Sequence, residues 1–192
     1  LANQLKSNDL TSHIPLLFLT AKTGVENKIA GLTTGAEDYI QKPFNISEIK
    51  LKIKNVLESR NQLLKKFKLE NPQELSVSNS KNDDKYLEKV NLVLDKHLEN
   101  SDFSVDQLCS ELAISRSQLY RKIQALTGKS IIEYINSYKL TIAMQLIKEK
   151  KYTLKEISYK IGYNDNRYFS RSFKKEFGNP PSYYVPKKNT LE

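Results

Sequence analysis

The chain of 192 residues has few of the side chains that most often carry metal and nucleophile chemistry. Cys109 is the single cysteine, which excludes an internal disulfide framework and a cysteine-based zinc cluster. The two histidines, His13 and His97, are far apart in the sequence. The sequence therefore offers few residues for metal binding or nucleophilic catalysis that depends on histidine. We therefore expect no cofactor, no metal site and no catalytic residues in this chain.

Long apolar runs are also missing. The longest is about Ile14–Leu19, and Pro15 interrupts it. A membrane helix needs roughly 20 apolar residues, so we expect no membrane contact in this segment. No signal peptide is visible, which favours a cytoplasmic location.

Positive charge is plentiful. Lys and Arg number 31 against 22 Asp and Glu, a formal net charge of +9, while 39% of residues are hydrophobic. This composition supports a packed core and points to a polyanionic partner. Residues 1–68 hold 11 basic and 6 acidic residues, residues 69–100 hold 4 and 7, and residues 101–192 hold 16 and 9. The basic excess is therefore strongest in the C-terminal part.

The polar, acidic stretch Glu70–Asp84 separates the two basic parts. Its length exceeds that of ordinary loops, so it is interpreted as a linker. We expect domains at 1–68 and 85–188 with a linker at 69–84. A long surface loop inside one domain is the alternative.

Helix-start signals are dense after residue 100. Ser or Thr is followed three residues later by Gln or Glu at Ser104, Ser115, Ser130 and Thr153, and each pair fits a capping box. Residues 86–98 place apolar side chains on one helical face. The pattern predicts a mainly α-helical C-terminal part.

This part contains an internal repeat. Residues 108–114 and 157–163 share one pattern at an offset of 49, and the match continues at an offset of 50, pairing Leu119 with Phe169 and Ile123 with Phe173. A helix, a tight turn and a second helix explain the pattern. The helices cross at small side chains, Cys109 and Ser158. The turn uses Ala113 or Gly162, at a position where either a large side chain would clash or φ is positive.

The second helix of each copy leaves a polar face opposite its apolar one. These faces carry cationic and hydrogen-bonding side chains that suit phosphate oxygens and base edges. They are predicted to bind DNA: Arg116, Ser117, Tyr120, Arg121, Gln124, Asn166, Arg167, Arg171 and Lys174. The alternative for any one of them is an ordinary solvated surface residue. Cys109 is interpreted as a small buried hydrophobe.

The region from about Phe103 to Tyr184 resembles the AraC family of transcription regulators. The resemblance is carried by the residues Ser115–Arg121, Thr127–Gly128, Glu133–Ile135, Ile157–Tyr163, Tyr168–Lys175 and Phe177–Tyr183. It implies two helix-turn-helix units joined by a long helix, each inserting a recognition helix into a major groove. Lys139, Tyr163 and Pro180 depart mildly from the family pattern. Residues 131–149 can form a helix of roughly 28 Å, which suits successive major grooves about 34 Å apart.

The N-terminal part follows another pattern. Residues 16–20 and 38–41 fit short buried strands, and residues 25–30 fit a helix. Asn45 and Glu48 signal the start of a long helix that continues to about Lys68. This order of elements predicts a parallel α/β unit.

This part resembles the C-terminal half of a response-regulator receiver domain, a flavodoxin-like α/β fold. The residues that carry the resemblance are Ser12–Ala21, Gly35–Ile40 and Lys42–Phe44. It implies that Thr20 and Lys42 contact a phosphoryl group and that Tyr39 is the aromatic switch residue. The aspartate acceptor and Mg²⁺-binding acids of the family would lie upstream of Leu1. We therefore expect Mg²⁺ only in an intact receiver and no phosphoryl acceptance by these residues.

A receiver joined to an AraC-type domain resembles a hybrid two-component regulator. The resemblance implies a histidine kinase module in the parent system and a parent that can be anchored in the inner membrane. We expect double-stranded DNA as the partner and self-association through the receiver segment.

The favoured function is sequence-specific transcription regulation governed by a receiver. The alternative is a receiver-derived association module with non-specific DNA binding. An enzyme acting through Cys109 is disfavoured, because no histidine or metal cluster lies near it in the sequence.

Overall fold

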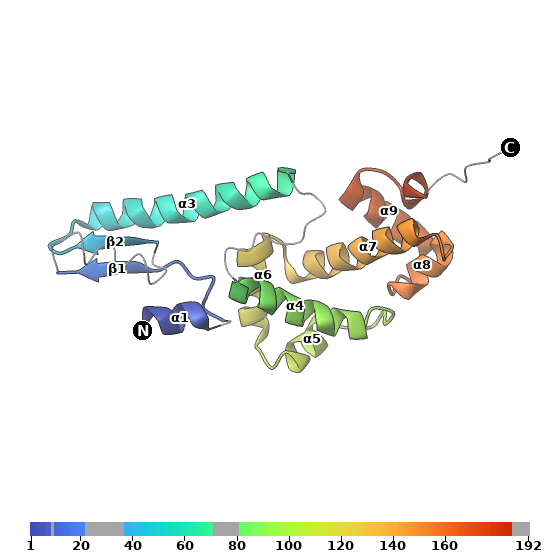
Figure 1. Ribbon diagram of the computed structural model, residues 1–192, viewed down its shortest axis with the longest axis horizontal. Helices are drawn as coiled ribbons and strands as arrows, with labels where there is room; N and C mark the ends of the chain where they lie inside the picture. Colours follow the sequence, from blue (N-terminus) through green and yellow to red (C-terminus); the bar gives the residue numbers. More distant parts are fainter. Residues whose placement is uncertain (9, 22–36, 71–80, 186–192) are drawn as a thin grey trace. The chain divides into compact units, whose positions relative to one another are not determined.

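The computed structural model describes residues 1–8, 10–21, 37–70 and 81–185 (Figure 1). Contacts divide these residues into two compact units. The first unit holds the described residues up to 70 together with 81–86, and the second holds 87–185. We describe each unit by itself.

The first unit contains two short strands and a long helix. After helix α1 (Ala2–Ser7), strand β1 (Leu17–Thr20) pairs in parallel with strand β2 (Asp38–Gln41). Helix α3 (Ile46–Glu70) follows. The predicted strands and their parallel order are confirmed, while the helix expected at residues 25–30 lies outside the described residues.

Helix α3 starts where the sequence predicts. The Asn45 carboxamide oxygen accepts a hydrogen bond from the Ser47 amide at 2.8 Å. Further along α3, the Lys52 ammonium donates to Asp38 Oδ2 at 2.8 Å and to the Tyr39 carbonyl at 3.0 Å. This lysine fastens α3 to β2, and Ile40 of that strand is buried.

The first helix-turn-helix unit consists of α5 (Val105–Glu111) and α6 (Arg116–Thr127). Ser104 and Ser115 form the predicted capping boxes at the two helix starts. Ala113, in the turn, has a φ of 53°, so the predicted positive φ is confirmed.

The second unit of this type consists of α8 (Leu154–Lys160) and α9 (Asn166–Phe177), followed by the short helix η1 (Pro181–Tyr184). Gly162 in its turn has a φ of 72°, and a Cβ there would lie 2.7 Å from the Leu98 carbonyl oxygen. The positive φ favours glycine, and the close approach leaves no room for a Cβ at this position.

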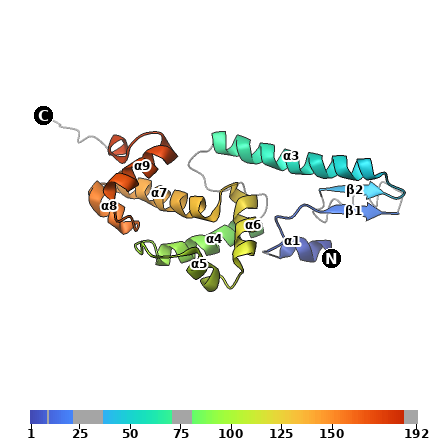
Figure 2. The ribbon, with the colours of Figure 1, turned by 180° about the vertical axis from the view of Figure 1, so that it is seen from behind.

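Helix α7 (Ile131–Glu149) joins the two helix-turn-helix units and has the predicted bounds. Helices α5 and α6 lie near its start, and α8 and α9 lie around its end (Figures 1 and 2). Its apolar side chains build the core around α8 and α9, which comprises Leu140, Ala143, Met144, Ile147, Ile157, Ile161, Tyr163, Phe169 and Phe173. The double helix-turn-helix architecture is thus confirmed.

Helix α4 (Lys81–Lys96) packs along α7. The Tyr134 hydroxyl donates to Asn91 Oδ1 at 2.7 Å. The helix begins five residues before the predicted start at Tyr86, so the last residues of the predicted linker are helical. Asp83 and Asp84 stand in its first turn, where carboxylates favour a helix N-terminus.

Candidate nucleic-acid interface

The repeat pairs predicted from the sequence occupy equivalent places. Leu119 of α6 and Phe169 of α9 are both fully buried, as are Ile123 and Phe173. Each helix therefore turns the same side toward the core and leaves its opposite side exposed. The structure confirms this orientation for both copies.

Helix α6 presents all five of its predicted interface residues to solvent. Four of them line one pocket of about 520 Å³, which also includes Val105, Ser130, Ile131 and Ile132. The four are Arg116, Ser117, Tyr120 and Arg121; Gln124 is exposed and does not line the pocket. The exposed face of α6 thus contributes two arginines and one tyrosine to the lining of a pocket.

Arg116 has an acidic neighbour. Its Nη1 lies 3.4 Å from Asp106 Oδ1, and both side chains are more than half exposed. Exposed pairs of this kind contribute little free energy, so the guanidinium can exchange this carboxylate for another anion.

Helix α9 exposes Asn166, Arg167, Arg171 and Lys174. Its start is capped by Asp165, whose Oδ1 accepts hydrogen bonds from the amides of Arg167 at 2.6 Å and Tyr168 at 3.1 Å. These amides, and then the charges of Arg171 and Arg167, lower the pKa of the Asp165 carboxyl. The Asp165 carboxylate, at the start of this basic face, is therefore hydrogen-bonded to the backbone of its own helix.

Sequence reasoning missed the Asp165 cap. An aspartate one residue before a helix is a known start signal, so the cap could have been found. It also missed the apolar edge of the pocket, where Ile132 is 60% exposed. Ile132 belongs to α7, and only the fold brings it beside Arg116 and Tyr120.

Cys109 is buried in α5. Burial, and then the nearby Asp106 carboxylate, raise the pKa of its thiol, against a smaller lowering by Arg116. The thiol is therefore protonated near neutral pH, in agreement with a packing role rather than a nucleophilic one.

Two of the three receiver-type residues, Thr20 and Lys42, lie together at one end of the small sheet. Thr20 ends β1 opposite Gln41, and the Lys42 amide donates to the Thr20 carbonyl at 2.7 Å. Thr20 and Tyr39 are partly buried, whereas Lys42 is exposed. The structure thus brings Thr20 and Lys42 together, while Tyr39 lies in β2 with its ring 5.6 Å from the Lys52 ammonium.

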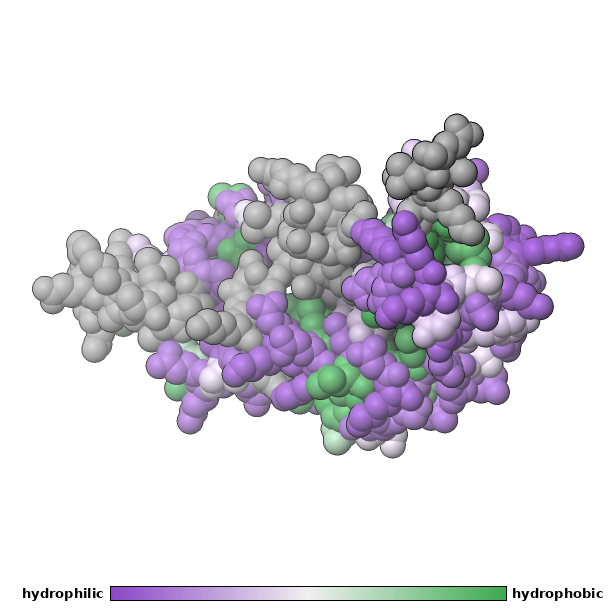
Figure 3. Space-filling view, turned by 45° about the vertical axis from the view of Figure 1, so that its right-hand side comes forward, coloured by the Kyte–Doolittle hydropathy of each residue, from purple (hydrophilic) through white to green (hydrophobic). Residues whose placement is uncertain are grey.

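The face shown in Figure 3 is mostly hydrophilic among the described residues, with hydrophobic patches between the hydrophilic residues. No helix within the described ranges has the length and apolar character to cross a bilayer. Among those residues, no group of three His, Cys, Asp or Glu side chains is placed to hold a metal ion.

Paired helices with a tight turn, each exposing one basic helix face, define the helix-turn-helix class of DNA-binding modules. Residues 108–186 match the family model described as "Helix-turn-helix domain". This part of the chain is similar to that family, and its two linked helix-turn-helix units have the arrangement of an AraC-type domain. The fold and the family match thus identify residues 108–186 as a helix-turn-helix domain.

Relatives cover both parts of the chain. Histidine kinase P4 of Formosa agariphila is 37% identical over 187 residues, which are 96% of this chain and 14% of that protein. The phosphate regulon transcriptional regulatory protein PhoB of Pseudomonas aeruginosa is 51% identical over 57 residues, 30% of this chain and 25% of PhoB. The chain thus spans a quarter or less of the length of these two relatives.

Among solved structures, the C-terminal domain of AraT, a response regulator from Geobacillus stearothermophilus, is similar to this chain. It is 26% identical, with a TM-score of 0.47, and the match covers 54% of this chain and 89% of that domain.

Proposed function

We propose that this chain recognises specific DNA sequences through the exposed faces of α6 and α9. The observation that carries the proposal is the equivalence of the two faces. Arg121 and Arg171 occupy matching repeat positions, both are exposed, and the buried sides of the two helices match as well. Two copies with the same bias are hard to explain as ordinary surface charge.

The pocket beside α6 combines cationic, hydroxyl and apolar side chains, so this face can make several kinds of contact with DNA. Arg116 and Arg121 suit guanine edges or phosphates, and Ser117 suits either a phosphate or a base edge. Tyr120 and Ile132 add apolar surface that suits the methyl group of thymine. A face with both kinds of contact can distinguish base pairs as well as attract the backbone.

Selection from a random DNA pool tests the proposal. The full chain should enrich a defined sequence motif within a few rounds, and the selected duplex should outcompete bulk DNA at physiological salt. A pool without any enriched motif would contradict sequence-specific recognition.

We further infer that the DNA-binding output is governed by a receiver in a two-component phosphorelay. The backbones of Thr20 and Lys42 are hydrogen-bonded at one end of the sheet, and 57 residues of the chain are 51% identical to PhoB. The likeness to Histidine kinase P4 supports a parent in which a kinase module supplies the phosphoryl group. Phosphorylation of the intact parent should raise its affinity for the selected duplex, and an unchanged affinity would contradict this inference.

The second candidate function is an association module that binds DNA without specificity. It is supported by large apolar side chains that α3 exposes, since Ile46 is 66%, Leu51 58% and Leu57 50% exposed. Self-association through residues 1–68 would cover such side chains. Equal affinity for the selected duplex and for a scrambled duplex would favour this candidate.

A further inference from the structure

Helix α9 contains one acidic residue, Glu176, and that acid is engaged inside the protein. Its Oε1 lies 2.9 Å from the Nζ atom of Lys129, which stands in the turn after α6. The two side chains are 18% and 26% exposed, and 47 residues separate them in the sequence. One ion pair thus joins the end of the first recognition helix to the second recognition helix.

The same ammonium also reaches the helix between them. Lys129 Nζ donates to Ser137 Oγ at 2.6 Å, and Ser137 is a buried residue of α7. Three segments therefore meet at one charged group: the turn after α6, α7 and α9. We call this arrangement, formed by Lys129, Ser137 and Glu176, the Lys129 bridge.

The turn that carries Lys129 is itself held in place. Gly128 ends α6 with a φ of 63°. The Lys129 amide donates to Thr127 Oγ1 at 3.1 Å, and that hydroxyl donates to the Ile123 carbonyl at 2.7 Å. These bonds fix the backbone of Lys129 relative to the last turn of α6.

We propose that the Lys129 bridge sets the separation and orientation of α6 relative to α9, and thereby the spacing of the two DNA segments that the chain reads. Lys129, Ser137 and Glu176 are positioning residues, because they act through the recognition helices. The inference rests on the proposed sequence-specific binding.

The physical reason lies in the geometry of the double helix. One added base pair moves the second segment about 3.4 Å along the axis and turns it by about 35°, since a turn of about 34–36 Å holds about 10 base pairs. A fixed pair of helices cannot follow that change without losing contacts. Two recognition helices that are no longer joined by the ion pair can adjust to part of the changed spacing. The bridge is partly shielded from solvent, so physiological salt screens it less than an exposed pair.

The test uses the full chain and a duplex selected from random DNA, with its two protected segments located by footprinting. Two altered duplexes carry one base pair more or one fewer between the segments. The spacing ratio is the Kd for an altered duplex divided by the Kd for the selected duplex, measured by fluorescence anisotropy. A uniform electrostatic change in affinity cancels in this ratio.

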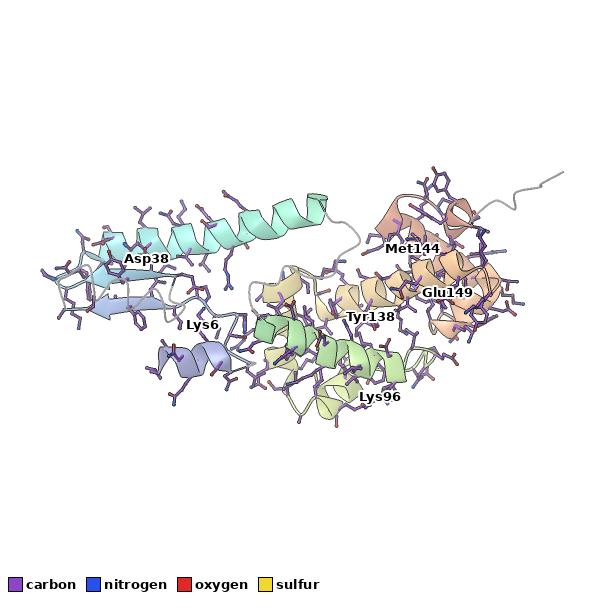
Figure 4. All side chains as sticks on the ribbon, viewed as in Figure 1. Lys6, Asp38, Lys96, Tyr138, Met144 and Glu149 are labelled. Carbon is purple, nitrogen blue, oxygen red and sulfur yellow. The ribbon has the colours of Figure 1, made fainter. Side chains whose placement is uncertain are left out.

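Four variants are compared with the wild type. Glu176→Gln and Lys129→Met each break the ion pair, and the double variant Lys129→Glu/Glu176→Lys reverses it. Ser137 can serve the reversed pair, because a hydroxyl both donates and accepts. The control is Glu149→Gln, which removes the same charge near the end of α7 (Figure 4). The Glu149 side chain is 47% exposed.

We expect the spacing ratio to fall about three- to tenfold in Glu176→Gln and Lys129→Met, within the range of coupling between contacting residues. The ratio should stay unchanged in Glu149→Gln and recover at least half of its wild-type value in the reversed pair. Unchanged ratios in both single variants would overturn the inference. A fall without recovery in the reversed pair would assign the effect to a residue alone and overturn the bridge.

Binding of the wild-type chain to the selected and scrambled duplexes distinguishes a failure of this inference from a failure of the proposed function. A wild-type chain that binds the selected and scrambled duplexes equally would overturn sequence-specific recognition, and this inference with it. A wild type that prefers the selected duplex, with variants whose ratios match its own, would overturn the bridge alone. A variant that has lost its fold is recognised by the loss of its helical circular dichroism, and the reversed pair then decides.

Discussion

The hydroxyl of Tyr138 donates a hydrogen bond to Asp95 Oδ1 at 2.7 Å and so joins the long helix α7 to α4 (Figure 4). One turn earlier on both helices, Tyr134 makes the equivalent bond to Asn91. The repeated spacing of four residues means that the two helices lie side by side over at least one turn. The part of α4 from Leu87 onward therefore packs with α7 in the second compact unit.

Replacing Tyr138 by Phe should lower the free energy of unfolding by about 1 kcal/mol, the usual net value of one hydrogen bond. Asp95 is exposed, so water can replace the lost donor and limit the effect. Urea unfolding followed by circular dichroism measures the change. Tyr183→Phe serves as the control, because Tyr183 is 69% exposed. Equal stability of the two variants would show that the Tyr138 bond contributes nothing.

Alkaline conditions should destabilise the protein partly through Tyr163. Burial, more than its charged neighbours, raises the pKa of the Tyr163 hydroxyl to about 12, while the unfolded chain ionises near pH 10. The unfolded state therefore gains charge first, and stability falls as pH rises from about 10 to about 12. Tyr163→Phe should lose less stability over this window, by on the order of 1–2 kcal/mol. Parallel unfolding curves at pH 8 and pH 11 measure the difference, which vanishes if Tyr163 ionises normally.

Arg121→Ala and Arg171→Ala should each weaken binding to the selected duplex by about 1–3 kcal/mol and relax preference at nearby base pairs. Both guanidinium groups are exposed on equivalent recognition faces. Binding isotherms on the selected duplex and on single-base variants measure both effects. Lys54→Ala, which removes an exposed cation of α3, is the control. Wild-type affinity and wild-type base preference in both arginine variants would exclude these residues from the interface.

Salt should weaken DNA binding steeply. The face of α6 and the face of α9 carry cations, and if about six phosphates are neutralised, log K should fall with log salt at a slope of about −5. Titrations at 50–300 mM salt measure the slope. Arg171→Ala should make the slope shallower by about one. A slope near zero would assign the positive charge of this chain to another purpose.

Local chemistry made much of the DNA-binding unit predictable. Each capping box couples a helix start to two residues three positions apart, so Ser115 and Gln118 identify the start of α6 without any tertiary contact. The positive φ of Ala113 followed from its alignment with Gly162, where a repeat demands the same turn. Burial of Leu119 and Phe169 followed from helical spacing in both copies.

Contacts between distant segments were not predictable from one sequence. Lys129 and Glu176 form an ion pair across 47 residues, and in the sequence each looks like an ordinary surface charge. Ile132 joins the pocket beside Tyr120 only because α7 starts next to α6. The start of α4 was placed too late because its first turn is polar and carries Asp83 and Asp84, which resemble linker composition.

Self-association should depend on residues 1–68. Helix α3 exposes Leu51 and Leu57, and in the described part of the sheet β1 and β2 pair only with each other. Apolar side chains and open strand edges of this kind favour pairing with another chain. We expect the full chain to be dimeric at micromolar concentration by light scattering, and a chain that begins at Lys81 to be monomeric. Leu51→Glu with Leu57→Glu should shift the full chain toward monomer, whereas Lys54→Glu, on the same helix, should not. A monomeric full chain, or a shortened chain that is equally dimeric, would contradict association through this segment.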